Sequence, residues 1–334
     1  VVPSTTAAAG EPFVKKVNCG GPKVADYDAD WPETPRSADC RDFYADWAKN
    51  QFGRAAAREI AEIFARVDGK LPIPVNWTNG PGGIRPDARR WDDVRKDFGF
   101  VDDLAALRPR LSWLGYRERF DYWLKTFEYM REVARFQCLW AEYNQAFDKV
   151  KAMTSPEAKT ALLAARVNMV DSLRAIFRGL LATASTIGEL GTIANWEQHN
   201  LPDSVEKPGE ELKKLLGVER LPVEAELPSS YEGPPRVIVP VVRTSLEAGE
   251  PLSLKVIVLS AVPPDEASFY WRELGKGKFR DVPIRKLARS VYQVDLPSLG
   301  GDIEYYIRAR LRDGDVVFPA TAPNLNQTVV VMPK

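Results

Sequence analysis

Histidine is almost absent from this sequence of 334 residues. It occurs once, as His199, and cysteine occurs three times. A His-based catalytic triad needs the imidazole beside a nucleophile and a carboxylate, and zinc sites generally need several imidazole or thiolate ligands. The H-E-x-x-H sequence, the P-loop and a G-x-G-x-x-G turn after a strand are also missing. Serine-hydrolase, zinc-protease and nucleotide-binding functions are therefore disfavoured, and we expect neither a metal site nor a cofactor.

An excess of charge of either sign is missing as well. Lys plus Arg number 46 and Asp plus Glu number 46, and no basic block gathers positive charge locally. Nucleic acid is therefore not an expected partner, because nucleic-acid binding depends on cationic side chains that neutralise phosphates. No apolar run approaches the roughly 18 to 20 residues that a membrane helix needs, so we expect no membrane span.

The first residues also lack two features. The chain begins with Val1 and has neither an initiator Met nor the apolar core of a signal peptide, so we expect a processed chain or a fragment of a longer one. Cys19, Cys40 and Cys138 form no C-x-x-C pair. Their spacing permits a disulfide between Cys19 and Cys40 without requiring one.

Aromatic residues, in contrast, are abundant. Nine Trp, eleven Tyr and fourteen Phe are more than a core of this size requires. Many of them recur at helical spacing from Trp123 to Val150, and a second stripe of this kind runs from Leu162 to Ile187. Between the stripes, Ser155 can cap a helix whose first residue is Pro156. The short connection predicts that the two long helices pack antiparallel.

Beyond residue 235 the apolar period changes from that of a helix to two, in six or seven short runs with turn residues between them. This pattern is typical of an antiparallel β-sandwich of the immunoglobulin-like (Ig-like) kind. The predicted fold is multidomain α plus β, an all-α helical array followed by this sandwich. The predicted divisions are an extended arm at 1–36, an α-helical domain at 37–220, a linker at 221–235 and the sandwich at 236–334.

A loop between 76 and 87 has the composition of a site for a polar ligand. Pro and Gly shape its backbone, and its chemistry-bearing side chains are Trp77, Asn79, Arg85 and Asp87. A sugar ring offers an apolar face to an aromatic ring and hydroxyls to amide and charged groups, while Arg also suits a uronate carboxylate. The alternative is that Trp77 is buried against the helices and anchors the loop to them, because burying an indole is strongly favourable.

The second dense cluster is Trp196, Glu197 and His199. It combines a ring, a carboxylate and the single imidazole. Trp196 could contact a substrate, and Glu197 with His199 could perform acid and base work if they meet. The alternative is a polar cluster at a helix end. The paired acids Asp92–Asp93 and Asp102–Asp103 lie on helical stretches where neighbours point apart, so we assign no glycosidase pair to them.

Three segments resemble parts of known carbohydrate-active proteins. Val17–Gly21 resembles the opening of malectin-like carbohydrate-binding modules. The region from Asp42 to His199 resembles the helical part that follows the catalytic barrel of large bacterial glycoside hydrolases of the α-glucuronidase and α-N-acetylglucosaminidase type. Ile303–Ala309, with Asp313-Gly314 and Phe318–Pro323 after it, resembles the Ig-like or fibronectin-like modules of such enzymes.

The resemblance implies the C-terminal portion or subunit of a secreted or periplasmic glycoside hydrolase. Its partners would be an oligosaccharide or polysaccharide and an upstream catalytic domain, because no β/α alternation here could build the barrel that carries the catalytic carboxylates. The helical domain would line or support a glycan cleft. One alternative is a non-enzymatic binding or assembly protein of a larger extracellular complex. Another is a self-sufficient helical lyase or hydrolase that uses Arg85, Glu197 and His199.

Overall fold

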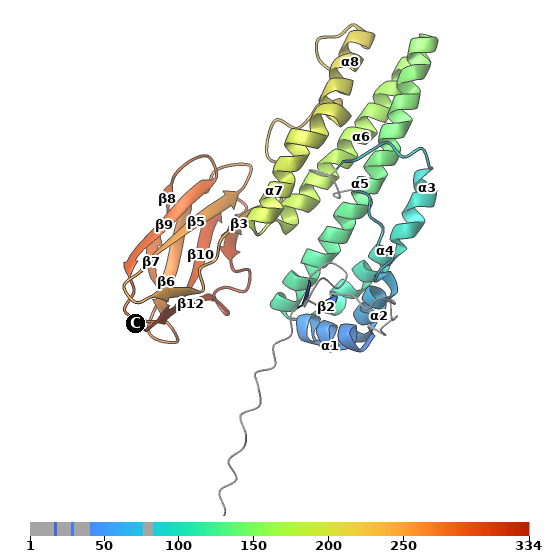
Figure 1. Ribbon diagram of the computed structural model, residues 1–334. Helices are drawn as coiled ribbons and strands as arrows, with labels where there is room; N and C mark the ends of the chain where they lie inside the picture. Colours follow the sequence, from blue (N-terminus) through green and yellow to red (C-terminus); the bar gives the residue numbers. More distant parts are fainter. Residues whose placement is uncertain (1–16, 19–27, 30–40, 76–82, 334) are drawn as a thin grey trace, which may run out of the picture. The chain divides into compact units, whose positions relative to one another are not determined.

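The computed structural model describes residues 17–18, 28–29, 41–75 and 83–333 (Figure 1). The chain divides into two units, Val1–Phe43 and Tyr44–Lys334, and each is described by itself. In the first unit, β1 (Val17–Asn18) pairs in parallel with β2 (Asp28–Ala29).

Cys19 and Cys40, and with them the disulfide considered above, lie outside the described residues. The third cysteine, Cys138, is buried as a free thiol.

Helices dominate the described chain up to residue 216, and strands dominate it from residue 236, so the predicted α plus β class is confirmed. The two long helices, α5 and α6, lie side by side (Figure 1). The helices are α1 (Arg41–Phe52), α2 (Ala57–Val67), α3 (Trp91–Val94), α4 (Gly99–Leu107), α5 (Leu114–Ala152), α6 (Pro156–Thr183), α7 (Ile187–Asn195) and α8 (Lys207–Leu216).

The turn between α5 and α6 forms as the sequence predicts. Ser155 Oγ accepts a hydrogen bond from the Ala158 amide at 3.1 Å, and Pro156 occupies the first turn of α6. A capping hydroxyl and a proline in the first turn both favour helix initiation at this point. The chain therefore reverses within three residues, and α6 runs back along α5.

Helix α5 serves two cores along its 39 residues, a length of about 58 Å. Its first half, with Phe120 and Phe127, packs on α1, α2 and α4. Its second half, with Phe136 and Tyr143, packs on α6 and on the helical segments that follow it. One helix thus joins two apolar clusters, which explains why its aromatic stripe is so long.

Aromatic rings interlock in the first of these cores. Trp47 of α1 lies 4.7 Å from Phe64 of α2 and 5.9 Å from Trp123 of α5, measured between ring centroids. Phe64 in turn meets Trp123 edge to face at 5.5 Å. Such tilted pairs contribute about 0.5 to 1.5 kcal/mol each beyond the burial of their area. The surplus of aromatic residues in this half is therefore used for packing.

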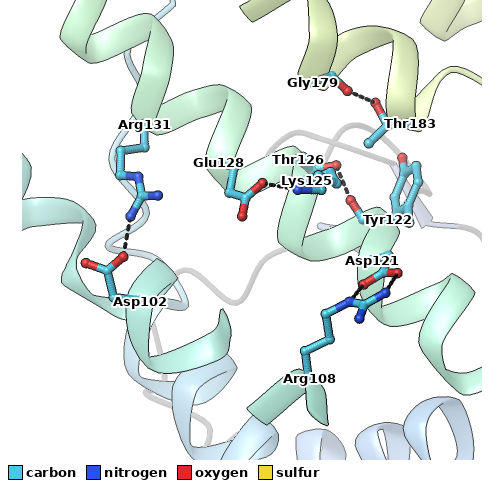
Figure 2. A network of polar contacts seen from close by, with 10 residues as sticks. All are labelled: Asp102, Arg108, Asp121, Tyr122, Lys125, Thr126, Glu128, Arg131, Gly179 and Thr183. Atoms are coloured by element: carbon cyan, nitrogen blue, oxygen red, sulfur yellow. Dashed lines mark hydrogen bonds and ion pairs between the residues drawn. The ribbon is translucent and has the colours of Figure 1, made fainter. Parts of the chain in front are cut away.

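Ion pairs join α5 to the short helices before it, as Figure 2 shows. Arg131 of α5 bonds Asp102 of α4 at 2.6 Å, and Asp121 of α5 accepts two hydrogen bonds from Arg108 in the 3-10 turn η2 (Arg108–Arg110). These groups are at the surface, so each pair contributes less than about 1 kcal/mol.

The chain from 187 to 216 is one continuous helical run interrupted by two wide π-turns, η3 (Trp196–Asn200) and η4 (Pro202–Glu206). The amide of Leu201 donates to the carbonyl of Trp196, and that of Lys207 donates to the carbonyl of Pro202. A proline follows each interruption: Pro202 lies two residues after the end of η3, and Pro208 lies two residues after the end of η4. Proline removes an α-helical hydrogen bond and clashes with a carbonyl of the preceding turn, so a widened turn accommodates it.

Among the described residues of the helical part, Arg166 is a buried charged side chain, with 2% of its surface exposed. Its Nε donates to the carbonyl of Ala225 at 3.1 Å, and its Nη1 donates to that of Val205 at 2.9 Å. Burial lowers the pKa of Arg166, yet a guanidinium stays protonated at neutral pH. A cation on α6 therefore holds two backbone segments that are distant in sequence, one in η4 and one in the 3-10 turn η5 (Val223–Ala225).

The segment 221–235, predicted as a linker, is fastened along α6. Arg174, two turns after Arg166, donates to the carbonyls of Val223 and Glu226 at 3.3 and 3.4 Å. Leu221 and Ala225 are buried in the same core as α6. These contacts hold the segment against the helix surface.

From residue 236 the chain forms two sheets. One has the order β4-β12-β10-β6-β7, with β11 also paired to β10, and the other has the order β3-β5-β9-β8. All pairs in them are antiparallel except β12 with β4. The strands are β3 (Arg236–Ile238), β4 (Ser245–Glu247), β5 (Pro251–Leu259), β6 (Glu266–Glu273), β7 (Arg280–Pro283), β8 (Arg285–Lys286), β9 (Val291–Ser298), β10 (Ile303–Leu311), β11 (Gly314–Phe318) and β12 (Gln327–Met332).

The two sheets share one core because their strands alternate between inward apolar and outward polar residues. Strand β5 alternates from Leu252 to Val258, with every second residue buried. Phe269 of β6 and Tyr305 of β10 stack at 4.8 Å inside this core. The alternation of apolar and polar residues, from which strands were predicted here, therefore matches the alternation of buried and exposed residues.

We predict that Arg166→Met lowers the free energy of unfolding by about 2 to 5 kcal/mol. The substitution leaves two buried carbonyls without their charged donor, and each unsatisfied group costs about 1 to 3 kcal/mol. Urea denaturation followed by Trp fluorescence measures the change. Arg58→Ala is the control, because its side chain is 88% exposed and its single ion pair is screened by water, so the free energy of unfolding should stay nearly unchanged.

Gly209 supplies a second test of the same contact. A Cβ at this position would lie 2.9 Å from Nη2 of Arg166, so the guanidinium has to shift when Gly209→Ala is made in the natural chain. The cost should shrink by at least about 0.5 kcal/mol in the Arg166→Met background, where the guanidinium is gone. Strictly additive effects would contradict the proposed role of Arg166.

Candidate functional site

The loop at 76–87 is described only in part. Trp77 and Asn79 lie outside the described residues. Val75 and Ile84, on either side of the gap, are both buried in the core shared by α5 and α6. Arg85 is exposed. Both flanks of the loop are thus anchored to the helices, and the sugar-binding hypothesis for it stays a prediction.

Asp87, the acid of that loop, is paired with Arg89 and not with Arg85. Its carboxylate accepts hydrogen bonds from Arg89 Nη2 at 2.7 Å and from Arg89 Nε, and its own amide donates to the Gln137 carbonyl of α5 at 3.0 Å. The hydrogen bond from Arg89 lowers the pKa of Asp87. Asp87 thereby ties the end of the loop to α5.

Trp196 lies in the core, with 1% of its surface exposed. Its Nε1 donates to the hydroxyl of Tyr129 on α5 at 3.0 Å, and its ring meets Phe136 and Phe177 edge to face. The polar neighbours of Trp196 in the sequence indicate a surface position, but the structure gives its ring a packing role between α5 and α6.

Glu197 and His199 are both exposed on the π-turn η3. No hydrogen bond or ion pair joins these two residues, which both lie in the described part of the chain. Side chains two residues apart on a helical turn do not face one another. The acid and base pairing considered from the sequence therefore has no geometric support, although Glu197 itself borders a cavity.

That cavity, which we call the α6 pocket, has a volume of about 230 Å³. Leu173, Phe177 and Leu181 line it from α6, spaced by four residues so that they share one helix face. Leu201 adds a further apolar wall. Its polar rim consists of Arg174, Arg178, Glu197, Ser230, Tyr231 and Glu232.

The pocket exists because the segment 221–235 crosses the exposed face of α6. Gly233 permits this close approach, since a Cβ there would lie 2.7 Å from a methyl carbon of Leu181 and 2.5 Å from the hydroxyl of Tyr231. The Tyr231 hydroxyl donates to the carbonyl of Pro234 at 2.7 Å. Burial raises the pKa of Tyr231 to about 12, so this phenol stays neutral at physiological pH.

The charged groups of the rim fall into two kinds. Arg174 is engaged through its two Nη atoms, which bond Asp171 at 2.9 Å and backbone carbonyls of the crossing segment. Its buried Nε lies 3.5 Å from Glu232 and donates no hydrogen bond to the described residues. Arg178 and Glu197 are exposed and make no hydrogen bond or ion pair with any described residue. One cation and one carboxylate are therefore free to meet a ligand at the mouth of an apolar cavity.

An apolar floor with a few convergent polar groups is the usual composition of a small-molecule site. The volume suits one sugar ring or another compact polar ligand with an apolar face. A guanidinium can bind a carboxylate or hydroxyls, and a carboxylate accepts hydrogen bonds from hydroxyls. Neither group is held in the paired arrangement that acid and base catalysis on a glycoside requires.

Sequence reasoning identified Glu197 but missed Arg174, Arg178, Tyr231 and Glu232. Arg174 and Arg178 are four residues apart and so lie near one face of α6. From the sequence alone, two charged residues in this arrangement are expected to face solvent, because the segment that covers them is distant in the sequence. Tyr231 and Glu232 lie in a Pro-rich and Gly-rich stretch that reads as a linker. Contacts between distant segments create the pocket, and the sequence alone does not reveal them.

Among the described residues, no group of three or more His, Cys, Asp or Glu side chains is placed to hold a metal ion. Within the same ranges, no helix is both long enough and apolar enough to cross a membrane.

No protein-family model matches this chain, and no curated protein matches it. Among solved structures, a complex of titin M10 with an obscurin-like 1 Ig domain is 18% identical, covering 30% of this chain and 98% of that chain with a TM-score of 0.20. An engineered protein is 10% identical over 72% of this chain and 71% of its own, with a TM-score of 0.25. The twitchin kinase region from C. elegans is 12% identical over 65% of this chain and 42% of its own, with a TM-score of 0.22.

These scores are too low to support an argument about fold or function.

We predict that Asp87→Asn lowers the free energy of unfolding by about 0.2 to 1 kcal/mol at pH 7, the range of a partly exposed ion pair. Because the folded state lowers the pKa of Asp87, its contribution is present above the unfolded pKa of about 3.9 and is lost as the pH falls through the folded pKa. The difference in the free energy of unfolding between Asp87→Asn and the natural chain should therefore become smaller below about pH 4. Urea denaturation at several pH values measures it.

Asp148→Asn is the control for this prediction, because Asp148 is an exposed residue of α5. It should change the free energy of unfolding by less than about 0.5 kcal/mol. If the stability difference between Asp87→Asn and the natural chain stayed constant as the pH fell, the carboxylate of Asp87 would not be the source of that difference.

Proposed function

We propose that this chain is the accessory portion of a secreted carbohydrate-active enzyme, with a helical part that binds glycan and an Ig-like β-sandwich after it. The catalytic carboxylates would belong to another domain or subunit. The observation that carries this proposal is the α6 pocket, where an apolar floor meets two unpaired charged groups, Arg178 and Glu197. A sugar ring has the matching combination of an apolar face and hydroxyls.

Two further features support the proposal. The sequence resembles the helical region and the appended modules of glycoside hydrolases of the α-glucuronidase and α-N-acetylglucosaminidase type. Two sheets that pack their inward residues into one core are also the general arrangement of an Ig-like domain. Secretion or a periplasmic location follows from the same resemblance and is part of the proposal.

Binding can be tested by isothermal titration calorimetry of the full chain with xylotetraose and with a xylotetraose that bears glucuronic acid. A pocket that holds one ring should bind with a Kd of about 0.1 to 1 mM, equivalent to about −4 to −5.5 kcal/mol. Arg178→Ala should weaken binding of the acidic sugar at least about tenfold, or about 1.4 kcal/mol, because it removes the free guanidinium.

His199→Ala is the matched control, because His199 is exposed but does not line the α6 pocket. It should leave the Kd unchanged. Failure of both sugars to bind would favour the alternative of a non-enzymatic assembly protein. Release of reducing sugar by the chain alone, abolished by Glu197→Gln, would instead show a self-sufficient enzyme and would contradict an accessory role.

A further inference from the structure

A second hollow lies in the two-sheet region, at the end where β6 turns into β7 and β9 turns into β10. Its volume is about 930 Å³. The β6–β7 hairpin supplies Lys276, Lys278 and Arg280 to one side, and the loop Leu299–Asp302 supplies the other. We call this hollow the hairpin groove. It shares no residue with the α6 pocket.

The hairpin that forms one wall is held in a defined conformation. The Glu304 carboxylate, on β10, accepts hydrogen bonds from Arg272 at 2.9 Å, from the Gly275 amide at 3.1 Å and from Asn326 at 2.8 Å. Burial alone would raise the pKa of Glu304, but these hydrogen bonds outweigh it and the pKa lies below its ordinary value. The carboxylate is therefore ionised and neutralises Arg272.

The two walls are also joined to each other at the base of the groove. The amide of Leu274 donates to the carbonyl of Asp302 at 3.0 Å, and a side-chain oxygen of Asp302 accepts from the amide of Val331 at 2.8 Å. Gly275 and Gly277 adopt left-handed conformations at φ +70° and +71°, which lets the hairpin turn tightly. The walls are thus set before any ligand arrives.

The groove carries an excess of unpaired positive charge. Lys278 and Arg280 form no hydrogen bond or ion pair with any described residue, and Lys276 has only a long, exposed contact of 3.9 Å to Glu273. Arg272 is paired with Glu304. The lining also holds the carboxylates of Glu273 and Asp302, so the groove keeps an excess of one positive charge. Three cations on one rigid hairpin face a hollow in a chain whose overall charge is zero. Such a local field attracts an anionic ligand.

Two aromatic rings near the groove each have one face covered by a guanidinium. The guanidinium of Arg280 lies over Trp271 at 5.3 Å, and that of Arg272 lies over Phe279 at 4.4 Å. Phe279 also meets Tyr306 edge to face at 5.1 Å. Single-stranded nucleic acid binds largely by stacking bases on open aromatic faces, so this arrangement disfavours it.

We propose that the hairpin groove binds an acidic polysaccharide, one that carries carboxylate or sulfate groups along its chain. Lys276 and Lys278 contribute charge that tracks the anionic groups, and Arg280 binds a carboxylate or sulfate with two parallel donors. Pro297 and Leu299, on the opposite side, give the sugar rings an apolar wall. The site is independent of the proposed function of the α6 pocket.

Affinity electrophoresis of the full chain in gels that contain polygalacturonate tests this proposal. The chain should be retarded by polygalacturonate and not by dextran, and retardation should weaken as salt is added. The double variant Lys276→Ala/Lys278→Ala should raise the apparent Kd at least about tenfold. Both lysines are exposed, so the melting temperature should be unchanged.

Three comparisons decide the outcome. Arg285→Ala/Lys286→Ala removes the same charge from β8 on the same pair of sheets and should leave binding nearly unchanged; an equal loss would mean nonspecific attraction and overturn the proposal. Arg178→Ala should also leave retardation intact; if it alone abolished retardation, polygalacturonate would be bound by the α6 pocket. Tighter binding of single-stranded DNA than of polygalacturonate would overturn the choice of ligand.

Discussion

Two arginines on one face of α6 hold the chain that follows the last helix, and the arrangement of the helical part depends on them. Arg166 and Arg174 lie two turns apart, and together they bond the backbone of η4 and of residues 223–226. Arg166 is buried, and a buried cation is costly unless its donors are satisfied, so the segments that provide its carbonyls must lie within reach of its guanidinium. This requirement draws the Pro-rich segment across α6 and so forms the pocket.

The same contacts explain why the charged rim is uneven. Arg174 is occupied by the segment it fastens, whereas Arg178, one turn later, lies beyond the fastened carbonyls and stays free. A single helix face thus supplies both a structural arginine and one available to a ligand. The hairpin groove repeats this division, because Arg272 is neutralised by Glu304 while Arg280 has no acidic partner among the described residues.

The long helices and the strands were predictable from the sequence because their signals are local. Ser155 and Pro156 mark the start of α6, and in β5 the buried residues are the apolar ones that alternate with polar residues in the sequence. Trp196 and the crossing segment were not predictable, because their positions depend on Tyr129 and Arg174, which are distant in sequence. A tryptophan beside Glu197 reads as exposed until the helix that buries it is known. Of the residues predicted for a site, Glu197 borders a cavity, while Trp77 and Asn79 lie outside the described part.

The two π-turns rotate the helix that contains them. Each residue of an α-helix turns the side-chain direction by about 100°, so Trp196 and Leu212 would point about 160° apart on an uninterrupted helix. Each π-turn adds one residue, and after two of them the same side chains differ by only about 40°. Both residues are indeed buried in one core. The prolines thus mark the places where the direction of the side chains is reset. A single helix can therefore keep one side toward its neighbours, although its apolar residues do not follow a regular helical period in the sequence.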